Sequence, residues 1–295
     1  MWIRTLTLFL LFLAPVTATA FNISLRPSEV AQGDAFLVIV EQSQGNKNTL
    51  PVGRFAGRKT EKIIFTKKIT KNFRKKQTGL YFGLSSVERS LSPGRYPIEV
   101  EFNGQKRSVD LTVLDASFRV ERLSLPEDKV TLSPKNAARA DRESARLKKI
   151  WGIGSPAYWT SGFVVPLNGK IGAVFGSRRI INGIEKSPHN GIDIKGKRGA
   201  PVHAISSGKI VLADDLFFGG KTIVIDHGHG LYSFYMHLDG FAAEPGGSVD
   251  KNDVVGYVGS TGRATGPHLH IGTKLWGVNV NPLSLTNLKL DDLWR

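Results

Sequence analysis

The two-residue rhythm of everything after Phe163 restricts the fold of this chain most. Short segments that alternate apolar and polar residues follow one another between glycines, and none has the period of a helix. Such alternation is typical of half-buried β-strands. We therefore expect an all-β C-terminal domain built on an antiparallel sheet. The expected strands are Gly169–Phe175, His189–Ile194, Pro201–Leu212, Lys221–Asp226, Leu231–His237, Gly256–Val258 and Pro267–Thr273.

All seven histidines fall within this region, between His189 and His270. Residues two apart in a strand share a face, so His189 and Asp193 are expected on one side with the small Gly191 between them. His268 and His270 also share a face. A catalytic zinc takes three ligands from His, Asp or Glu and keeps one position open. Two imidazoles and one carboxylate meet that count, so the sequence predicts one zinc site.

The chain has 295 residues and no cysteine. That length favours two domains. The lack of cysteine excludes disulfides, a thiol nucleophile and thiolate ligands, so any metal must be held by nitrogen and oxygen. Residues 1–20 read as an export signal, with Arg4, an apolar run from Leu6 to Leu13 and the sequence Ala18-Thr19-Ala20. We expect a periplasmic, cell-envelope or secreted protein.

Residues 21–115 predict a β-sandwich of immunoglobulin-like size. Alternating runs recur at Lys62–Thr70, Tyr96–Phe102 and Ser108–Leu114, and Asn103-Gly104 is a hairpin signal. Residues 116–160 are expected to be a linker, with a basic helix over Lys135–Ile150 that begins after Ser133-Pro134. Residues 161–290 then form the second domain.

The net charge of +15 is concentrated in the first half of the chain. Between Arg54 and Lys76 there are ten basic residues and one acid, Glu61. A positive surface on an exported protein favours anionic wall polymers or a membrane surface, and nucleic acid is not an expected partner. The alternative is an ordinary solvated surface.

The motifs of the second domain resemble the lysostaphin-like, or LytM-type, zinc metallopeptidases that cut peptidoglycan peptides. The resemblance covers the region after about residue 160 and includes an H-x-x-x-D, a Y-x-H-L and an H-x-H motif. It implies that His189, Asp193 and His270 bind one zinc ion, and that His237 and His268 assist catalysis. The matching text is His189-Asn190-Gly191-Ile192-Asp193, Tyr235-Met236-His237-Leu238 and Gly266-Pro267-His268-Leu269-His270.

The resemblance implies a zinc endopeptidase that hydrolyses peptidoglycan stem or cross-link peptides, and we expect the protein to be a monomer. His268 is assigned as the general base and His237 as the donor to the developing oxyanion, although these roles are exchangeable. Loops around Arg178–Ser187 and Leu212–Gly220 are expected to set bond specificity. Two alternatives stay open: a noncatalytic relative that activates other wall hydrolases, and a latent enzyme inhibited by its first domain.

Three histidines outside the motifs, His203, His227 and His229, are interpreted as packing or turn residues. The segment Gly219-Gly220-Lys221-Thr222 resembles the end of a phosphate-binding loop, but the first glycine of that motif is replaced by Asp215. It is interpreted as a turn.

Overall fold

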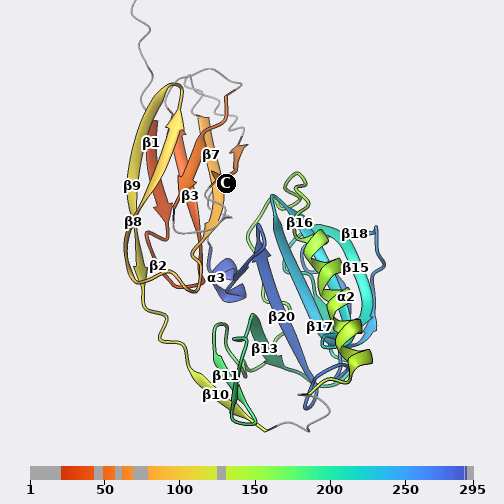
Figure 1. Ribbon diagram of the computed structural model, residues 1–295. Coiled ribbons are helices and arrows are strands. Elements are labelled where there is room, and N and C mark those ends of the chain that lie inside the picture. Colours follow the sequence, from red (N-terminus) through yellow and green to blue (C-terminus); the bar gives the residue numbers. More distant parts are fainter. Residues whose placement is uncertain are drawn as a thin grey trace, which may run out of the picture.

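The computed structural model describes residues 21–42, 49–56, 62–68, 79–124, 131–288 and 290. It is mostly β-structure arranged as two domains (Figure 1), which confirms the all-β prediction. The expected export signal and most of the basic Arg54–Lys76 segment lie outside the described residues. None of the described helices has the length and apolar character needed to cross a bilayer.

Two sheets face each other in the N-terminal domain. The first has the order β1 (Phe21–Arg26), β3 (Ala35–Gln42), β7 (Gly79–Ser86), β6 (Phe65–Lys68). The second has the order β2 (Glu29–Ala31), β9 (Gln105–Leu114), β8 (Gly94–Phe102), β4 (Val52–Phe55), β5 (Lys62–Ile63). Assignment of this sandwich to the immunoglobulin-like class stays a prediction.

The hairpin predicted at Asn103-Gly104 joins β8 and β9, where Phe102 pairs with Gln105. Asn103 and Gly104 have φ values of 50° and 74°. Positive φ at both central residues matches the twist of the flanking strands, and Asn-Gly accepts it readily. Local turn chemistry therefore fixes this register.

Strand β3 is buried on both faces. Phe36, Val38 and Val40 point into the core between the two sheets. The alternate residues Ala35, Leu37 and Ile39 belong to a second core, which is shared with the C-terminal domain. This is why the sequence from Ala35 to Val40 is continuously apolar instead of alternating.

Several further contacts join the two domains. The Phe82 ring lies 5.8 Å from the Trp159 ring within the shared core. The Asn281 amide donates to Asp34 Oδ1 at 2.8 Å, and the Ala35 N–H donates to Ser284 Oγ at 2.9 Å. The first domain is therefore attached to the second through apolar packing and buried hydrogen bonds, with α3 (Pro282–Thr286) between them (Figure 1).

The C-terminal domain contains a nine-stranded antiparallel sheet. Its main order is β13-β20-β17-β16-β15-β18, and β14, β19 and β21 pair at its margins. The strands are β13 (Gly191–Lys195), β14 (Pro201–His203), β15 (Gly208–Leu216), β16 (Gly220–Gly228), β17 (Leu231–Phe241), β18 (Ser248–Val249), β19 (Val254–Val258), β20 (His268–Leu275) and β21 (Val278–Val280).

The strand expected at Gly169–Phe175 is not formed. Only Ile171 makes an isolated bridge, to Ile194. The segment still runs beside β13, because the Gly172 N–H donates to the Asp193 carbonyl at 2.8 Å and the Lys195 N–H donates to the Lys170 carbonyl at 2.9 Å. Short α3 was also missed, because five residues carry too little helical period to recognise.

The linker contributes to the second domain. Strand β10 (Val120–Leu123) pairs in parallel with β11 (Arg178–Ile181), which forms a hairpin with β12 (Ile184–Lys186). The expected specificity loop at Arg178–Ser187 is therefore largely this hairpin. A turn at Asn182-Gly183, with φ values of 51° and 83°, connects its strands.

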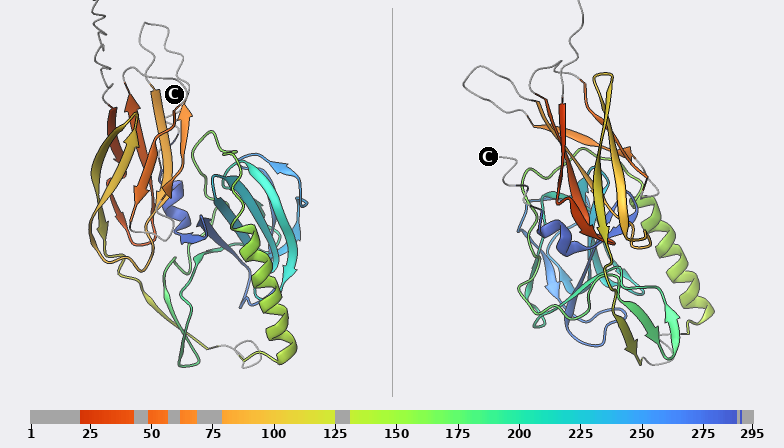
Figure 2. Two further views of the ribbon diagram at one scale, coloured as in Figure 1. Left: turned by 45° about the horizontal axis from the view of Figure 1, so that its top comes forward. Right: turned by 90° about the vertical axis from the view of Figure 1, so that its left-hand side faces the viewer.

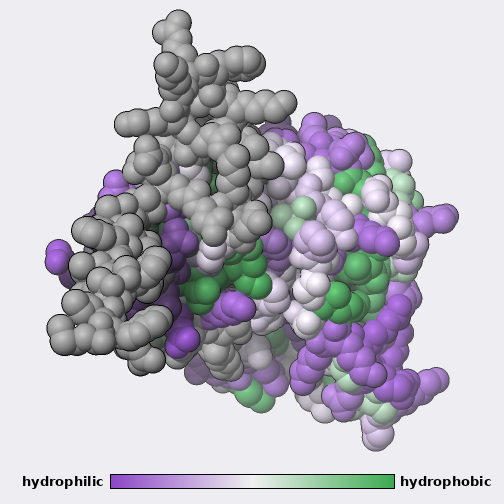
Figure 3. Space-filling view, turned by 90° about the horizontal axis from the view of Figure 1, so that it is seen from above, coloured by the Kyte–Doolittle hydropathy of each residue, from purple (hydrophilic) through white to green (hydrophobic). Residues whose placement is uncertain are grey.

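Helix α2 spans Pro134–Ile150, and Ser133 caps it by accepting from the Asn136 N–H. The helix was expected to connect the domains, but it lies against the C-terminal sheet (Figure 2). Leu147 and Ile150 pack against an apolar cluster that includes Tyr232 and Phe234. Only its last two turns supply apolar contacts, so its basic sequence gave little sign of docking. Seen from above, the described surface mixes hydrophilic residues with small hydrophobic patches (Figure 3).

Candidate metal centre

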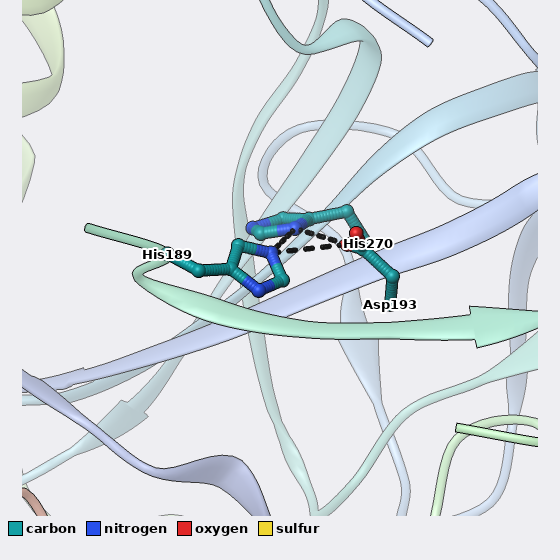
Figure 4. Close-up of side chains that lie close together, drawn as sticks. All are labelled: His189, Asp193 and His270. Carbon is teal, nitrogen blue, oxygen red and sulfur yellow. Dashed lines mark hydrogen bonds and ion pairs between the residues drawn. The ribbon is translucent and has the colours of Figure 1, made fainter. Parts of the chain in front are cut away.

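Three predicted ligands meet on one face of the C-terminal sheet (Figure 4). Asp193 on β13 lies directly opposite His270 on β20 in the antiparallel register, and His189 immediately precedes β13. Asp193 Oδ1 lies 2.7 Å from His270 Nδ1 and 3.1 Å from His189 Nε2. The two histidine nitrogens are 2.9 Å apart. This is the sole potential metal-binding cluster found among the described residues.

Gly191 makes room for this cluster. A Cβ atom at this position would lie 2.9 Å from His270 Nε2 and 2.2 Å from the Ile271 carbonyl oxygen. Any side chain would therefore push the two strands apart or displace the imidazole. The glycine predicted to leave a gap between two ligands does so.

The donor set fits a zinc ion. His189 Nδ1 lies 3.1 Å from the carbonyl oxygen of Val174, which only accepts, so Nδ1 carries the proton and Nε2 presents a lone pair to Asp193. Two acceptors that face each other at 3.1 Å need a cation between them. Tetrahedral ligands about 2.0–2.1 Å from zinc are roughly 3.3–3.4 Å apart. The observed triangle opens to that size with small side-chain shifts.

Charge and burial in the cluster favour an ionised carboxylate. Burial raises the pKa of Asp193, but its contacts with the His189 and His270 imidazoles outweigh burial and hold that pKa well below its usual range. Burial lowers the pKa of His270, which favours the neutral imidazole that a metal requires. The Nη2 atom of Arg179 lies 3.5 Å from Asp193 Oδ2, so Oδ1 remains directed at the histidines.

His237 follows Met236 on β17 and lies beside the cluster, with its ring centroid 6.1 Å from that of His270. Its φ of 64° is unusual for a residue with a side chain. The backbone N–H donates to the Gly219 carbonyl at 2.7 Å, and ring Nδ1 donates to the Thr261 carbonyl at 2.9 Å. Two loops thus hold this imidazole in a strained orientation, as is common at functional sites.

His268 is held in the same way. Its Nδ1 donates to the Gly266 carbonyl at 2.8 Å, and its Nε2 lies 3.9 Å from Asp193 Oδ1. The rings of His237 and His268 are 4.8 Å apart. Burial, followed by the positive charge of His270, lowers the pKa of His237 to about 3. In its neutral form each imidazole therefore presents a lone pair at Nε2.

This arrangement refines the roles expected of the two histidines. A neutral imidazole whose Nδ1 donates to a carbonyl can only accept at Nε2. Both His237 and His268 are therefore acceptors when neutral, and His237 becomes a donor to an oxyanion only after it takes up a proton. Because His237 and His268 hold their Nδ1 protons in the same way, either one can serve as the general base and the other as the donor to the oxyanion.

A groove of about 740 Å³ runs past Asp193 and His268. The groove borders β13, the start of β20 and the loop that precedes β20. Its lining consists of Asn168, Gly172, Ala173, Asp193, Lys195, Gly196, Lys197, Thr265, Gly266, Pro267 and His268. A peptide lying there would reach the metal cluster from one side.

The other three histidines lie apart from the cluster. His227 is buried and bonded to the Ser207 carbonyl and to Ser233. His229 occupies the β16–β17 turn with φ of 50°, and His203 Nδ1 contacts the Asn252 carbonyl at 2.8 Å. These contacts agree with the packing and turn interpretation.

Sequence reasoning missed the groups that orient the site. The carbonyls of Val174, Thr261 and Gly266 fix three imidazoles, and every residue has a carbonyl, so no residue type signals them. Arg179 had a weak signal as a basic residue shortly before the first ligand. Its ion pair with Glu121, 3.5 Å away, depends on the parallel pairing of β10 and β11 and could not be foreseen.

Comparison with known proteins places this geometry in a family. The model of Peptidase family M23 matches residues 187–282. This range includes the three candidate ligands and the two neighbouring histidines, namely His189, Asp193, His237, His268 and His270. That segment is an M23 peptidase domain.

Two named relatives share this M23 domain. A 97-residue segment is 40% identical to the DD-carboxypeptidase/endopeptidase Mpg of Neisseria meningitidis, covering 33% of this chain and 22% of Mpg. A 97-residue segment is 35% identical to the peptidoglycan DD-endopeptidase ShyA of Vibrio cholerae, covering 33% of this chain and 23% of ShyA. The matched segment thus spans less than a quarter of each relative.

The likeness of fold extends beyond the M23 domain. A solved Pseudomonas aeruginosa structure described as peptidase M23 superposes with a TM-score of 0.60 at 24% identity. It covers 85% of this chain and 93% of that one. Both the sandwich and the M23 domain therefore belong to a shared fold.

Proposed function

We propose that this chain is an exported zinc-dependent endopeptidase that hydrolyses peptide bonds in peptidoglycan. The observation that carries the proposal is the triangle of His189 Nε2, Asp193 Oδ1 and His270 Nδ1, with edges of 2.7–3.1 Å. Two more imidazoles, from His237 and His268, present free Nε2 atoms beside it. A structural cluster would need no such pair of open acceptors.

The proposed chemistry divides between the ligands and the two free imidazoles. A bound zinc would act as a Lewis acid on the scissile carbonyl and lower the pKa of a coordinated water. His268 accepts the proton of the attacking water at Nε2, because this atom lies 3.9 Å from Asp193 Oδ1 at the edge of the cluster. The proton that His268 accepts passes to the leaving amine, directly or through His237, whose ring lies 4.8 Å away. His237, fixed by Thr261 and Gly219, donates to the developing oxyanion while it carries that proton.

Peptidoglycan is the proposed substrate because the relatives named Mpg and ShyA are described as acting as DD-endopeptidases. The groove beside Asp193 and His268 supports a peptide substrate, since an extended chain can lie along it. Among peptidoglycan bonds, a D-alanyl cross-link is the first choice. The scissile carbonyl would face the three ligands with the leaving amine towards the free imidazoles.

Export is proposed from the first twenty residues, which have the charge, apolar run and small-residue ending of a cleaved signal. The absence of cysteine is compatible with an oxidising compartment outside the cytoplasm. Fractionation of cells that produce the full chain, followed by N-terminal sequencing, tests this part. A protein that keeps its first residues and stays in the cytoplasm would contradict it.

The decisive experiment measures metal and hydrolysis in the same preparation. The full chain should bind one zinc per molecule by elemental analysis and release soluble fragments from purified sacculi. Mass spectrometry of defined cross-linked muropeptides would identify the bond. The noncatalytic alternative predicts no stoichiometric zinc and no fragments, and the complete set of ligands argues against it.

A further inference from the structure

Arg263 lies in the loop between β19 and β20 and has no role in the mechanism proposed above. Its guanidinium lies over the ring of Phe218, with the central carbon 4.5 Å from the ring centroid. Stacking occupies the flat face of a guanidinium and leaves the N–H donors at its edge free. Within the described ranges, no carboxylate forms an ion pair with this side chain.

The loop that carries Arg263 is attached to the loop that holds His237. The Arg263 N–H donates to the Phe218 carbonyl at 2.9 Å. A Cβ at Gly262 would lie 2.3 Å from the Gly220 nitrogen, so the two backbones touch. Because the neighbouring Gly219 and Thr261 carbonyls fix His237, one platform orients both the imidazole and the guanidinium.

Positive charge accumulates at this edge of the site. Burial, and then the charge of Arg179, lower the pKa of Arg263. Arg179 is already committed, because its guanidinium contacts Glu121 and Asp193 at 3.5 Å each. The Arg263 side chain is nevertheless exposed, and its N–H donors are open to a group from outside the chain. A carboxylate is the group that a guanidinium edge binds best, through two parallel hydrogen bonds.

We propose that Arg263 binds a free carboxylate of the substrate peptide and so helps to select the bond that is cleaved. The inference rests on the proposed peptidase function and deepens it by naming the substrate group recognised. Peptidoglycan stem peptides offer two sources of this chemistry, a terminal D-alanyl carboxylate and carboxylates within the stem. A planar, bidentate pair between guanidinium and carboxylate would fix the position of the peptide relative to His237, which the same two loops hold.

The test uses the zinc-loaded full chain and a synthetic D-alanyl cross-linked stem-peptide dimer in three forms. One form has all carboxylates free, one has the terminal carboxylate amidated, and one has the internal carboxylates amidated. Arg263→Ala should raise KM roughly 10- to 100-fold for the free form, with a smaller change in kcat. Wild-type protein should show the same penalty on whichever amidated form lacks the recognised carboxylate. The variant should no longer distinguish the forms.

Two further variants make the result specific. Arg263→Lys keeps the charge but loses bidentate geometry, so an intermediate KM is expected. Arg198→Ala removes an exposed guanidinium that is paired with Asp239 at 2.7 and 3.1 Å, and should leave all three KM values unchanged. Zinc content and the unfolding midpoint should match wild type in each case. Equal loss of kcat on all three dimers would overturn the proposal, because it would indicate a transition-state role instead.

A binding measurement separates failure of this inference from failure of the proposed function. Calorimetric titration with the uncleaved tetrapeptide, with free or amidated carboxylates, reports recognition without turnover. If wild-type protein cleaves no dimer but binds the free peptide at least tenfold more tightly than the amidated one, and Arg263→Ala abolishes that difference, the subsite stands without the peptidase. Equal binding of the two peptides by wild type would refute the subsite.

Discussion

Two groups of histidines occupy opposite faces of the same sheet. His270 lies on the face that carries the candidate metal centre, whereas Ser233 and Tyr235 on β17 point to the other face. There Ser233 bonds to buried His227 and to the Tyr235 hydroxyl. In the His227 group, Nδ1 donates to the Ser207 carbonyl and Nε2 accepts from Ser233 at 2.7 Å. Every polar atom of that imidazole is satisfied within the protein.

The candidate metal centre has similar residue types and the same placement of the Nδ1 protons, but its Nε2 atoms are not satisfied in the same way. Carbonyls take the Nδ1 protons of His189, His237 and His268, and the remaining nitrogens point lone pairs into the site. Buried polar groups are normally paired, so a cluster of imidazoles with open acceptors needs a ligand. Because a backbone carbonyl holds Nδ1 in both groups, the comparison shows that the group facing Nε2 separates a packing histidine from a candidate functional one.

The largest effect should come from Asp193→Asn, because it removes the only carboxylate of the ligand triangle. Zinc affinity should fall at least about 100-fold and peptide hydrolysis should be lost. Without metal, the variant should unfold at the same urea concentration as wild type or at a higher one. The substitution removes the repulsion between the Asp193 carboxylate and the His189 Nε2 lone pair. Zinc titration and urea unfolding check both. If the metal-free variant were less stable than wild type, the Asp193 cluster would be a structural network like that of His227, and the contrast between the two groups would be wrong.

His268→Ala should abolish turnover and leave the metal in place. The expected fall in kcat is roughly 10²- to 10⁴-fold, the usual contribution of a general acid or base. Zinc stoichiometry should remain one per chain, because His268 Nε2 is 3.9 Å from Asp193 and outside the ligand triangle. The measurement is kcat on a muropeptide dimer beside elemental analysis. Retained turnover would remove His268 from the mechanism.

His227→Ala should show the reverse pattern. It deletes a fully buried ring and leaves the Ser207 carbonyl and Ser233 without partners, so stability should fall by about 3 kcal/mol. The folded fraction should still bind zinc at one per chain. Urea unfolding of the chelated protein gives the loss, and zinc titration at low temperature gives the stoichiometry. Loss of zinc with unchanged stability would break the distinction between the two groups.

The same buried imidazole should make stability depend on pH. Burial lowers the pKa of His227 from 6.5 to about 4, so between these values the unfolded chain binds a proton that the folded chain excludes. Stability is therefore highest above pH 6.5 and falls as the pH decreases, by about 2 kcal/mol at pH 5. Unfolding of chelated wild type at pH 8 and pH 5 measures the total change. Subtracting the change in His227→Ala isolates this group, and a zero difference would contradict the assignment.

The ligand triangle was accessible from the sequence because strand geometry imposes it. Asp193 and His270 sit opposite each other in regular strands, where residue spacing determines direction. His189 was expected to begin a strand but precedes the observed strand β13, so its position depends on the carbonyl of Val174 instead. The positive φ of His237 and the partners of its ring arise from contacts between distant loops, which no local pattern encodes.

The same limit applies to the fold. The Asn103-Gly104 hairpin and the Ser133 cap were predictable because both depend on residues close in sequence. The docking of α2 was not, since Leu147 and Ile150 alone mark its apolar side. The apolar run from Ala35 to Val40 did contain the signal of a strand covered on both faces, but its second cover could be identified only in three dimensions.

Strand β3 couples the unfolding of the two domains. Since its side chains enter two cores in alternation, separation of the domains would expose Leu37, Ile39 and their partners around Trp159 to water. Heating should therefore melt both halves together in one calorimetric transition. An M23 domain produced without the first domain would expose the apolar surface of the shared core and tend to aggregate. A change in its activity would therefore reflect its solubility before it could show that the first domain inhibits the enzyme.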